Sequence, residues 1–168
     1  MVIWLTGLSA SGKTTIAEAL INNLKDRGHR VEHLDGDLIR KIFPGTGFTR
    51  EERDRHVKRI GYLAAMLEKH DVFVVASFIS PYQEARAFVR SQCKNFFEVY
   101  VSTPLAECEK RDPKGLYKKA RTGEISNFTG ISDPYEPPEN PEIEIDTTGI
   151  TVDEAVTRIQ TYLTKTYA

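Results

Sequence analysis

The sequence predicts an α/β fold with three layers, in which helices flank a parallel β-sheet. Three observations predict it. Short apolar runs of strand length alternate with segments of helical periodicity along the chain. A glycine-rich loop, residues 7–14, separates the first apolar run from the first helical segment. The length of 168 residues and the 40% share of hydrophobic residues suit one domain that spans residues 1–168.

The first half of the chain predicts two strands and two helices. The apolar run 2–6 indicates the first strand, and the helix that follows ends at Gly28 and has an apolar face made of Ile16, Ala17, Leu20 and Leu24. A second strand is expected at 31–34, followed by a polar turn. The next helix is expected from about 49 to 70. Its start is indicated by Thr49 and Glu52, which have the spacing of a capping box.

The second half continues the alternation. Residues 72–76 form the most buried strand candidate, and four prolines between 133 and 141 exclude a helix there. The other elements are, in order, a helix at about 83–93, a strand at 97–101, a helix from near Pro104, a strand at 143–146 and a last helix that Thr151 and Glu154 cap. Ligands of such a sheet bind beyond the carboxyl ends of its strands.

The composition argues against large anionic partners. Lys and Arg number 23 against 24 Asp and Glu, so we expect neither a nucleic acid nor a membrane as partner. No apolar run approaches a membrane span, and residues 1–6 are too short for a signal peptide, so we expect a cytoplasmic protein. Cys93 and Cys108 lack metal-ligand spacing, and we expect both to be reduced and structural.

The loop Gly7-Leu-Ser-Ala-Ser-Gly-Lys-Thr14 matches the phosphate-binding pattern G-x-x-x-x-G-K-[ST] and lies between a predicted strand and a predicted helix. Its glycines let backbone N–H groups point at phosphate oxygens, and the ammonium of Lys13 reaches the β and γ phosphates. Thr14 offers its hydroxyl to Mg²⁺. The motif predicts the P-loop NTPase fold. Since no Asn-Lys-x-Asp motif of GTPases occurs, we expect ATP as the nucleotide.

Two carboxylates, Asp35 and Asp37, follow the second strand directly at the predicted ligand edge. We expect Asp35 to serve magnesium and Asp37 to orient an acceptor hydroxyl and take its proton. Phosphoryl transfer asks little more of the protein, because it depends mainly on positioning and on neutralising charge. The alternative is a type I turn that uses Asp and Gly for their turn chemistry.

A basic cluster comes after the aspartates. It consists of Arg40, Arg53, Arg55, Lys58 and Arg59. The cluster either binds a doubly anionic acceptor or forms the solvated face of a helix, and the composition leaves both open.

Two further segments are candidates. Ser80, within Phe78-Ile-Ser-Pro-Tyr82, either contacts the acceptor or precedes the next helix. The basic segment 111–121 lies where small kinases carry a mobile lid, although an ordinary exposed helix would have the same sequence pattern. We assign no function to the histidines without ligand spacing, which are His29, His33 and His70.

These residues leave three functional classes open. The first is a P-loop kinase for a small molecule such as a sugar acid, shikimate or a nucleotide. The second is a nucleotide-binding regulatory module without turnover, against which the predicted acceptor carboxylate Asp37 argues. The third is a polynucleotide kinase, which the near-zero net charge disfavours.

The chain also resembles one family, the adenylylsulfate kinases. The resemblance covers nearly the whole chain and rests on residues 7–14, Leu34-Asp-Gly-Asp37, Phe78-Ile-Ser-Pro81, Arg111-Asp-Pro-Lys-Gly-Leu-Tyr-Lys-Lys-Ala120, Gly123-Glu-Ile125, Asn127-Phe-Thr-Gly-Ile131 and Pro134-Tyr135. It implies transfer of the ATP γ-phosphoryl group to the 3′-hydroxyl of adenosine 5′-phosphosulfate. The product would be 3′-phosphoadenosine 5′-phosphosulfate, for sulfate activation.

The motifs described above and the resemblance together predict a set of site residues. Lys13, Asp35 and Asp37 would be catalytic, with Thr14 and Asp35 at the metal. ATP would contact Gly7, Ser9, Ala10, Ser11, Gly12, Lys13, Thr14, Thr15 and Arg111, the last beside its adenine. The acceptor would contact Asp37, Arg40, Phe48, Arg53, His56, Ile79, Ser80, Lys114, Asn127 and Phe128.

Within this set, Phe48 and Phe128 would hold the acceptor adenine between two aromatic faces, and Arg40 and Arg53 would bind the phosphosulfate. A lid would cover about 111–135. Position 56 holds His where many members have Asn, which leaves that contact open. Because the family commonly forms homodimers, the resemblance also implies a homodimer.

Overall fold

Five parallel strands form one sheet in the computed structural model, which describes residues 1–43 and 45–167. The strands are β1 (Val2–Thr6), β2 (Val31–Asp35), β3 (Phe73–Ser77), β4 (Phe96–Val101) and β5 (Ile143–Ile145), in the order β2-β3-β1-β4-β5. The predicted parallel sheet is confirmed. The most completely buried strand is β1 and not the predicted β3, because β1 lies at the centre and helices cover both of its faces.

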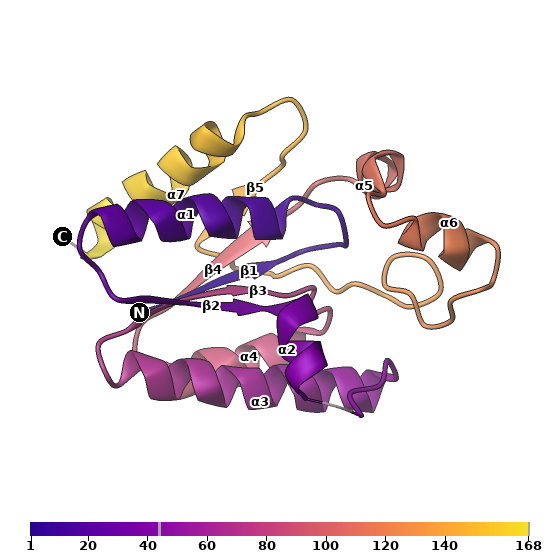
Figure 1. Ribbon diagram of the computed structural model, residues 1–168, viewed down its shortest axis with the longest axis horizontal. Coiled ribbons are helices and arrows are strands. Elements are labelled where there is room, and N and C mark those ends of the chain that lie inside the picture. The colour runs from indigo at the N-terminus through magenta and orange to yellow at the C-terminus, as the bar shows by residue number, and fades with distance from the viewer. Residues whose placement is uncertain (44, 168) are drawn as a thin grey trace.

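Helices cover both faces of the sheet (Figure 1). The long ones are α1 (Lys13–Asp26) and α7 (Val152–Tyr167) on one face, and α3 (Arg50–Glu68) and α4 (Gln83–Gln92) on the other. Each pair encloses a core against the sheet, around Ile3, Leu5 and Leu20 on the first face and around Trp4, Ile60 and Val89 on the second. The short helices α2 (Gly36–Ile42), α5 (Leu105–Arg111) and α6 (Leu116–Arg121) lie toward the carboxyl ends of the strands.

The predicted helix starts are confirmed where side chains cap them. Thr49 accepts a hydrogen bond from the Glu52 N–H, and the Glu52 carboxylate accepts one from the Thr49 N–H. The same reciprocal pair joins Thr151 and Glu154 at α7. Each box satisfies two backbone donors that a helix start otherwise leaves unpaired.

The polar turn predicted after the second strand is wrong, because α2 begins there. The Asp35 carboxylate accepts hydrogen bonds from the Asp37 N–H at 3.0 Å and the Leu38 N–H at 3.1 Å, so it caps the helix. Asp37 in the first turn and the basic Arg40 and Lys41 in the last turn also match the polarity of the helix dipole. These charges stabilise a helix of only seven residues.

Within the described residues, no helix combines the length and the apolar character that crossing a membrane requires.

Residues 111–135 contain the end of α5, the whole of α6 and irregular backbone, and they lie beside the loops at the carboxyl edge of the sheet. Tyr117, Ala120 and Phe128 of this segment pack together with Cys108 of α5 in a small separate core.

Gly61 brings α3 and α4 close together, since a Cβ at this position would lie 2.4 Å from Cγ2 of Val89. Gly61→Ala should therefore lower the free energy of unfolding by roughly 1–3 kcal/mol, the usual range for overpacking, although alanine is the better helix former. Urea titration measures this difference. The double variant with Val89→Ala should be more stable than the sum of the two single effects predicts. A stabilised Gly61→Ala variant would show that the helices separate freely.

Candidate active site

The loop between β1 and α1 has backbone conformations that need its glycines. Gly12 has φ of +103°, and a Cβ on Gly7 would lie 2.4 Å from the Val101 carbonyl oxygen. Ala10 also has positive φ, at +58°. Ser9 and Ser11 complete the loop, and the exposed Thr14 and Thr15 lie in the first turn of α1. The helix start and the wound backbone together suit phosphate oxygens.

Two threonines that the sequence analysis did not identify hold this loop. The Ser11 carbonyl oxygen accepts hydrogen bonds from the hydroxyls of Thr103, at 3.0 Å, and Thr147, at 2.9 Å. Both threonines follow strands, β4 and β5, and their position at the ligand edge is the signal that could have identified them. Arg111 donates to the Thr147 hydroxyl at 2.7 Å, so the predicted adenine contact lies beside the phosphate loop.

Lys13 is buried and turned onto its own loop. Its ammonium donates to the Leu8 carbonyl oxygen and, at 3.3 Å, to the Ser11 hydroxyl. Burial lowers the pKa of Lys13 to about 8, while the charges of Asp37 and Asp35 oppose the shift. The side chain therefore keeps its positive charge at neutral pH, close to both carboxylates.

Asp35 connects four elements through its carboxylate. One oxygen caps α2, and the other accepts hydrogen bonds from the Ser77 hydroxyl at 3.1 Å and the Thr14 hydroxyl at 3.3 Å. Burial favours the neutral acid, but these hydrogen bonds outweigh burial and lower the pKa of Asp35. A carboxylate and a hydroxyl thus meet at the start of α1, where a divalent cation could share them.

Asp37 faces the segment 111–135 from the first turn of α2. Its exposed carboxylate pairs with the ammonium of Lys114, which belongs to the loop between α5 and α6. The predicted acceptor carboxylate and the predicted lid lysine are therefore in direct contact.

Arg40, Phe48, Arg53 and Asn127 also come together. The guanidinium carbons of Arg40 and Arg53 lie 4.6 and 5.3 Å from the centroid of the Phe48 ring. Arg53 is buried, and it donates to the backbone oxygens of Phe48, at 2.8 Å, and Asn127. Asn127 has φ of +54°, a left-handed conformation that this carbonyl contact helps to hold.

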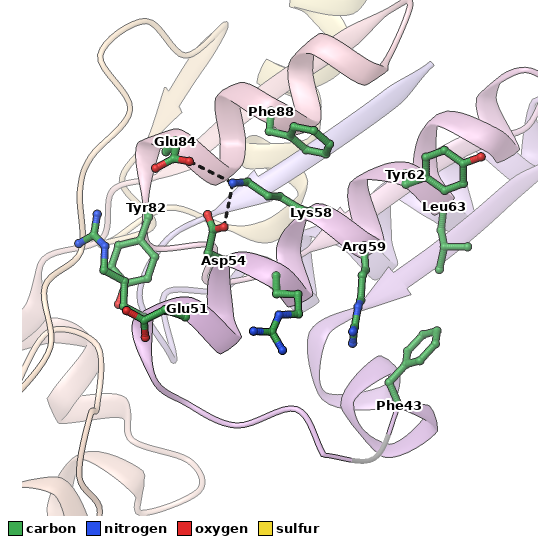
Figure 2. A pocket seen from close by; sticks show the side chains of 12 residues that line it. Phe43, Glu51, Asp54, Lys58, Arg59, Tyr62, Leu63, Tyr82, Glu84 and Phe88 are labelled. Carbon is green, nitrogen blue, oxygen red and sulfur yellow. Dashed lines mark hydrogen bonds and ion pairs between the residues drawn. The ribbon is translucent and has the colours of Figure 1, made fainter.

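The other members of the basic cluster do not join this group. Arg55, Lys58 and Arg59 lie on the outer side of α3, where they line a groove of about 830 Å³ between α3 and α4 (Figure 2). Lys58 pairs with Asp54 at 2.8 Å and Glu84 at 3.0 Å. Their proximity in the sequence suggests a single basic cluster. Because neighbouring residues of a helix point in different directions, however, Arg53 points inward and these three residues point away from it.

The two aromatic residues predicted to enclose an adenine lie in different settings. Phe48 is 53% exposed, whereas Phe128 is buried and packs edge-on against Tyr117, with 5.0 Å between the ring centroids. Tyr117, which the sequence analysis did not single out, donates its hydroxyl to the Ser9 carbonyl oxygen at 2.9 Å. It joins the segment 111–135 to the phosphate loop.

Ser80 is buried and fully hydrogen-bonded within the protein. Its hydroxyl accepts from the Trp4 indole N–H at 3.0 Å and donates to the Thr6 hydroxyl at 3.0 Å. Thr6 in turn donates to the Ile79 carbonyl oxygen at 2.8 Å. These contacts fix the backbone of residues 79 and 80, which has φ of +38° at Ser80.

His56 is 2% exposed, and neither of its ring nitrogens has a hydrogen-bond partner among the described residues. Its ring meets Phe78 edge-on at 6.1 Å. Burial, with the nearby charges of Arg40 and Arg59, lowers the pKa of His56 to about 4. The imidazole is therefore neutral at physiological pH, with one donor and one acceptor nitrogen.

Comparison with known proteins decides the family. The family model described as adenylylsulphate kinase matches residues 1–146. The chain belongs to the adenylylsulfate kinase family. An adenylyl-sulfate kinase of Gloeothece citriformis is 52% identical over 160 residues, which are 95% of this chain and 91% of that protein.

Solved structures agree with this family. An APS kinase of Mycobacterium tuberculosis in complex with AMPPNP and APS superposes with a TM-score of 0.91 and 38% identity, over 97% of this chain and 96% of that chain. A shikimate kinase from Aquifex aeolicus, with a TM-score of 0.54, 19% identity and coverage of 98% and 97%, shares the fold alone. The chain is an ATP-dependent kinase, a phosphotransferase with an alcohol group as acceptor, and such an enzyme uses a nucleotide with a divalent metal.

Because His56 is buried as a neutral imidazole, the stability of the protein should depend on pH. Its pKa in the folded protein, about 4, lies below the unfolded value of about 6.5, so the unfolded chain binds an extra proton between these values. Stability should fall through this window as the pH is lowered, by at most about 3 kcal/mol from this group. His56→Asn should remove that part of the slope in urea titrations at pH 7, 6 and 5.

The exposed His70, replaced by Asn in the same way, serves as the control for the substitution itself. Equal slopes for the wild type and His56→Asn would mean that His56 is not held neutral.

Proposed function

We propose that this enzyme transfers the γ-phosphoryl group of ATP to the 3′-hydroxyl of adenosine 5′-phosphosulfate, giving 3′-phosphoadenosine 5′-phosphosulfate and ADP. The observation that carries the proposal is that the phosphate loop, Asp37 and the Arg40–Arg53 pair meet at one sheet edge below the segment 111–135. The family and the APS bound by the relative from Mycobacterium tuberculosis support this acceptor.

At the ATP end, backbone N–H groups of residues 7–14 would cradle the phosphates. Lys13 would leave its contacts with Leu8 and Ser11 and reach the β and γ phosphates, where its charge offsets the charge of the transition state. Arg111, held by Thr147 and by Glu107 at 3.2 Å, would lie against the adenine. Ser9, Ala10 and Thr15 would complete this site.

We propose Mg²⁺ as the metal, with Thr14 and Asp35 as the protein groups that hold it. The described residues contain no cluster of three or more His, Cys, Asp or Glu side chains suited to a metal. A hydroxyl and one carboxylate, with phosphate oxygens and water for the rest, match the way in which Mg²⁺ binds beside nucleotides. When bound, it would neutralise charge on the phosphates.

At the acceptor end, Asp37 would accept a hydrogen bond from the 3′-hydroxyl and orient its oxygen toward the γ-phosphorus. As the new P–O bond forms, the bond to the β–γ bridging oxygen breaks, ADP leaves and the hydroxyl proton passes to Asp37. Arg40 and Arg53 would bind the phosphosulfate, whose oxygens suit two guanidinium groups. Ile79, Ser80 and His56 would line the wall beside it.

Residues 111–135 would act as a lid. Its ion pair between Lys114 and Asp37 must open before Asp37 can receive the acceptor hydroxyl, which would free Lys114 for a charged group of the substrates. Arg53 would hold the far end of the lid through Asn127, and Phe128 would bring its ring toward Phe48 as the lid closes. Closure would exclude water from ATP and so prevent its hydrolysis.

We further propose one domain over residues 1–168, a homodimer and a cytoplasmic location. The family resemblance supports the homodimer, and the α3–α4 groove exposes aromatic surface, with Tyr62 60% and Phe88 37% exposed, between charges of both signs (Figure 2). A second copy of the chain suits such a surface. Cys93 and Cys108 are free thiols, as expected in a reducing compartment.

The assignment of the acceptor predicts a selective turnover. ADP release from Mg-ATP should occur with adenosine 5′-phosphosulfate and not with shikimate, gluconate, nucleoside monophosphates or no acceptor. Asp37→Asn should lower kcat at least about 100-fold, the usual loss for a general base, with stability within about 0.5 kcal/mol because Asp37 is exposed. Asp26→Asn, at the far end of α1, is the matched control.

Turnover with another acceptor in the panel would keep the kinase and exclude this substrate. ATP binding without ADP release in any well would favour the regulatory module. Retained activity in Asp37→Asn would assign the hydroxyl to a different group.

The stacking role of Phe48 predicts a selective loss of acceptor affinity. Phe48→Ala should raise the KM for the phosphosulfate about 5- to 150-fold, equivalent to about 1–3 kcal/mol per stacked base, with the KM for ATP unchanged. Ile42→Ala, also exposed on the outside of α2, should leave both constants unchanged. An equal rise of both KM values for Phe48→Ala would contradict stacking. Phe128→Ala should also weaken the acceptor more than ATP, but it removes a core side chain and costs stability as well.

A further inference from the structure

The register of β2 and β3 gathers three polar side chains on one face of the sheet. Asp35 pairs with Ser77, and His33 pairs with Val75. Side chains alternate along a strand, and paired residues of neighbouring strands point to the same side. His33, Asp35 and Ser77 therefore share a face with Val75, which belongs to the core beneath α1. Thr14, in the first turn of α1, lies over the same face.

The hydrogen bonds in this group have a defined direction. The Asp35 carboxylate accepts from the Ser77 hydroxyl at 3.1 Å, and this bond uses the only proton of Ser77. Ser77 Oγ can then only accept from His33 Nε2, which lies 3.1 Å away. Consequently His33 carries a proton on Nε2, and the chain of donors runs from His33 through Ser77 to Asp35.

These hydrogen bonds from His33 and Ser77 set the rotation of the Asp35 carboxylate. The N–H groups of Asp37 and Leu38 hold one oxygen, and Ser77 holds the other at the side where it meets the Thr14 hydroxyl. The torsion of a carboxylate about its last bond is otherwise broad. Without Ser77, nothing from β3 would hold the oxygen that faces Thr14.

We propose that Ser77 and His33 are positioning residues, which hold the Asp35 carboxylate in the orientation that binds the divalent cation of the nucleotide complex. The inference rests on the proposed roles of Thr14 and Asp35. Partners behind a metal ligand commonly change metal affinity about 10- to 100-fold when they are removed. The competing explanation is that both side chains only fill space at the ends of the strands.

The test measures metal binding directly, without turnover. Electron paramagnetic resonance should follow the binding of Mn²⁺ to the complex of the enzyme with ADP. Ser77→Ala should weaken Mn²⁺ about tenfold, while affinity for metal-free ADP stays within about twofold. His33→Phe should weaken Mn²⁺ a few-fold, and His33→Gln, which keeps an N–H donor, should bind it as the wild type does. His29→Gln, a histidine outside the network, is the control.

An isosteric pair separates the hydroxyl from packing. Ser77→Thr should bind Mn²⁺ more tightly than Ser77→Val, although the two side chains have the same shape. Equal Mn²⁺ affinity in this pair, or in Ser77→Ala and the wild type, would overturn the inference. Acceptor turnover by the wild type is measured separately. If the phosphosulfate is not phosphorylated but Mn²⁺ affinity still depends on Ser77, the proposed acceptor fails and the positioning role stands.

Discussion

The carboxylate of Asp35 is the contact on which the rest of the site depends. It ends β2, caps α2, accepts a hydrogen bond from β3 and meets the first turn of α1. Through this one side chain, the neighbouring β2 and α2 are fixed to α1 and β3, which lie farther away in the sequence. Because α2 starts from this cap, the positions of Asp37 and Arg40 relative to the phosphate loop follow from it.

Local patterns predicted most of the fold because they act over short distances. The capping boxes at Thr49 and Thr151 and the glycine-rich loop need only a few neighbouring residues to form. The wrong prediction of a turn in place of the start of α2 has a different cause. Asp35-Gly-Asp37 is compatible with a turn and with a helix start, and the Ser77 and Thr14 contacts that fix Asp35 come from other elements.

Individual residues of the site could be predicted from the sequence, but the contacts between them could not. Sequence patterns identified Lys13, Asp35 and Asp37 from their places after strands, which a parallel sheet brings to one edge. They could not tell that Arg53 turns inward while Arg55 and Arg59 face the outer groove, because that depends on how α3 is rotated against the sheet. Thr103, Tyr117 and Thr147 were missed, since hydroxyl groups that support a loop carry no motif of their own.

The small core of Cys108, Tyr117, Ala120 and Phe128 constrains how acceptor choice could change, by evolution or by engineering. Phe128 belongs to the segment's internal packing, so a substitution that reshapes its contact with a ligand also loosens the segment that carries it. Phe48 is exposed, so a substitution there does not disturb internal packing in this way. New acceptor preferences are therefore more readily reached through the loop before α3 than through the segment opposite.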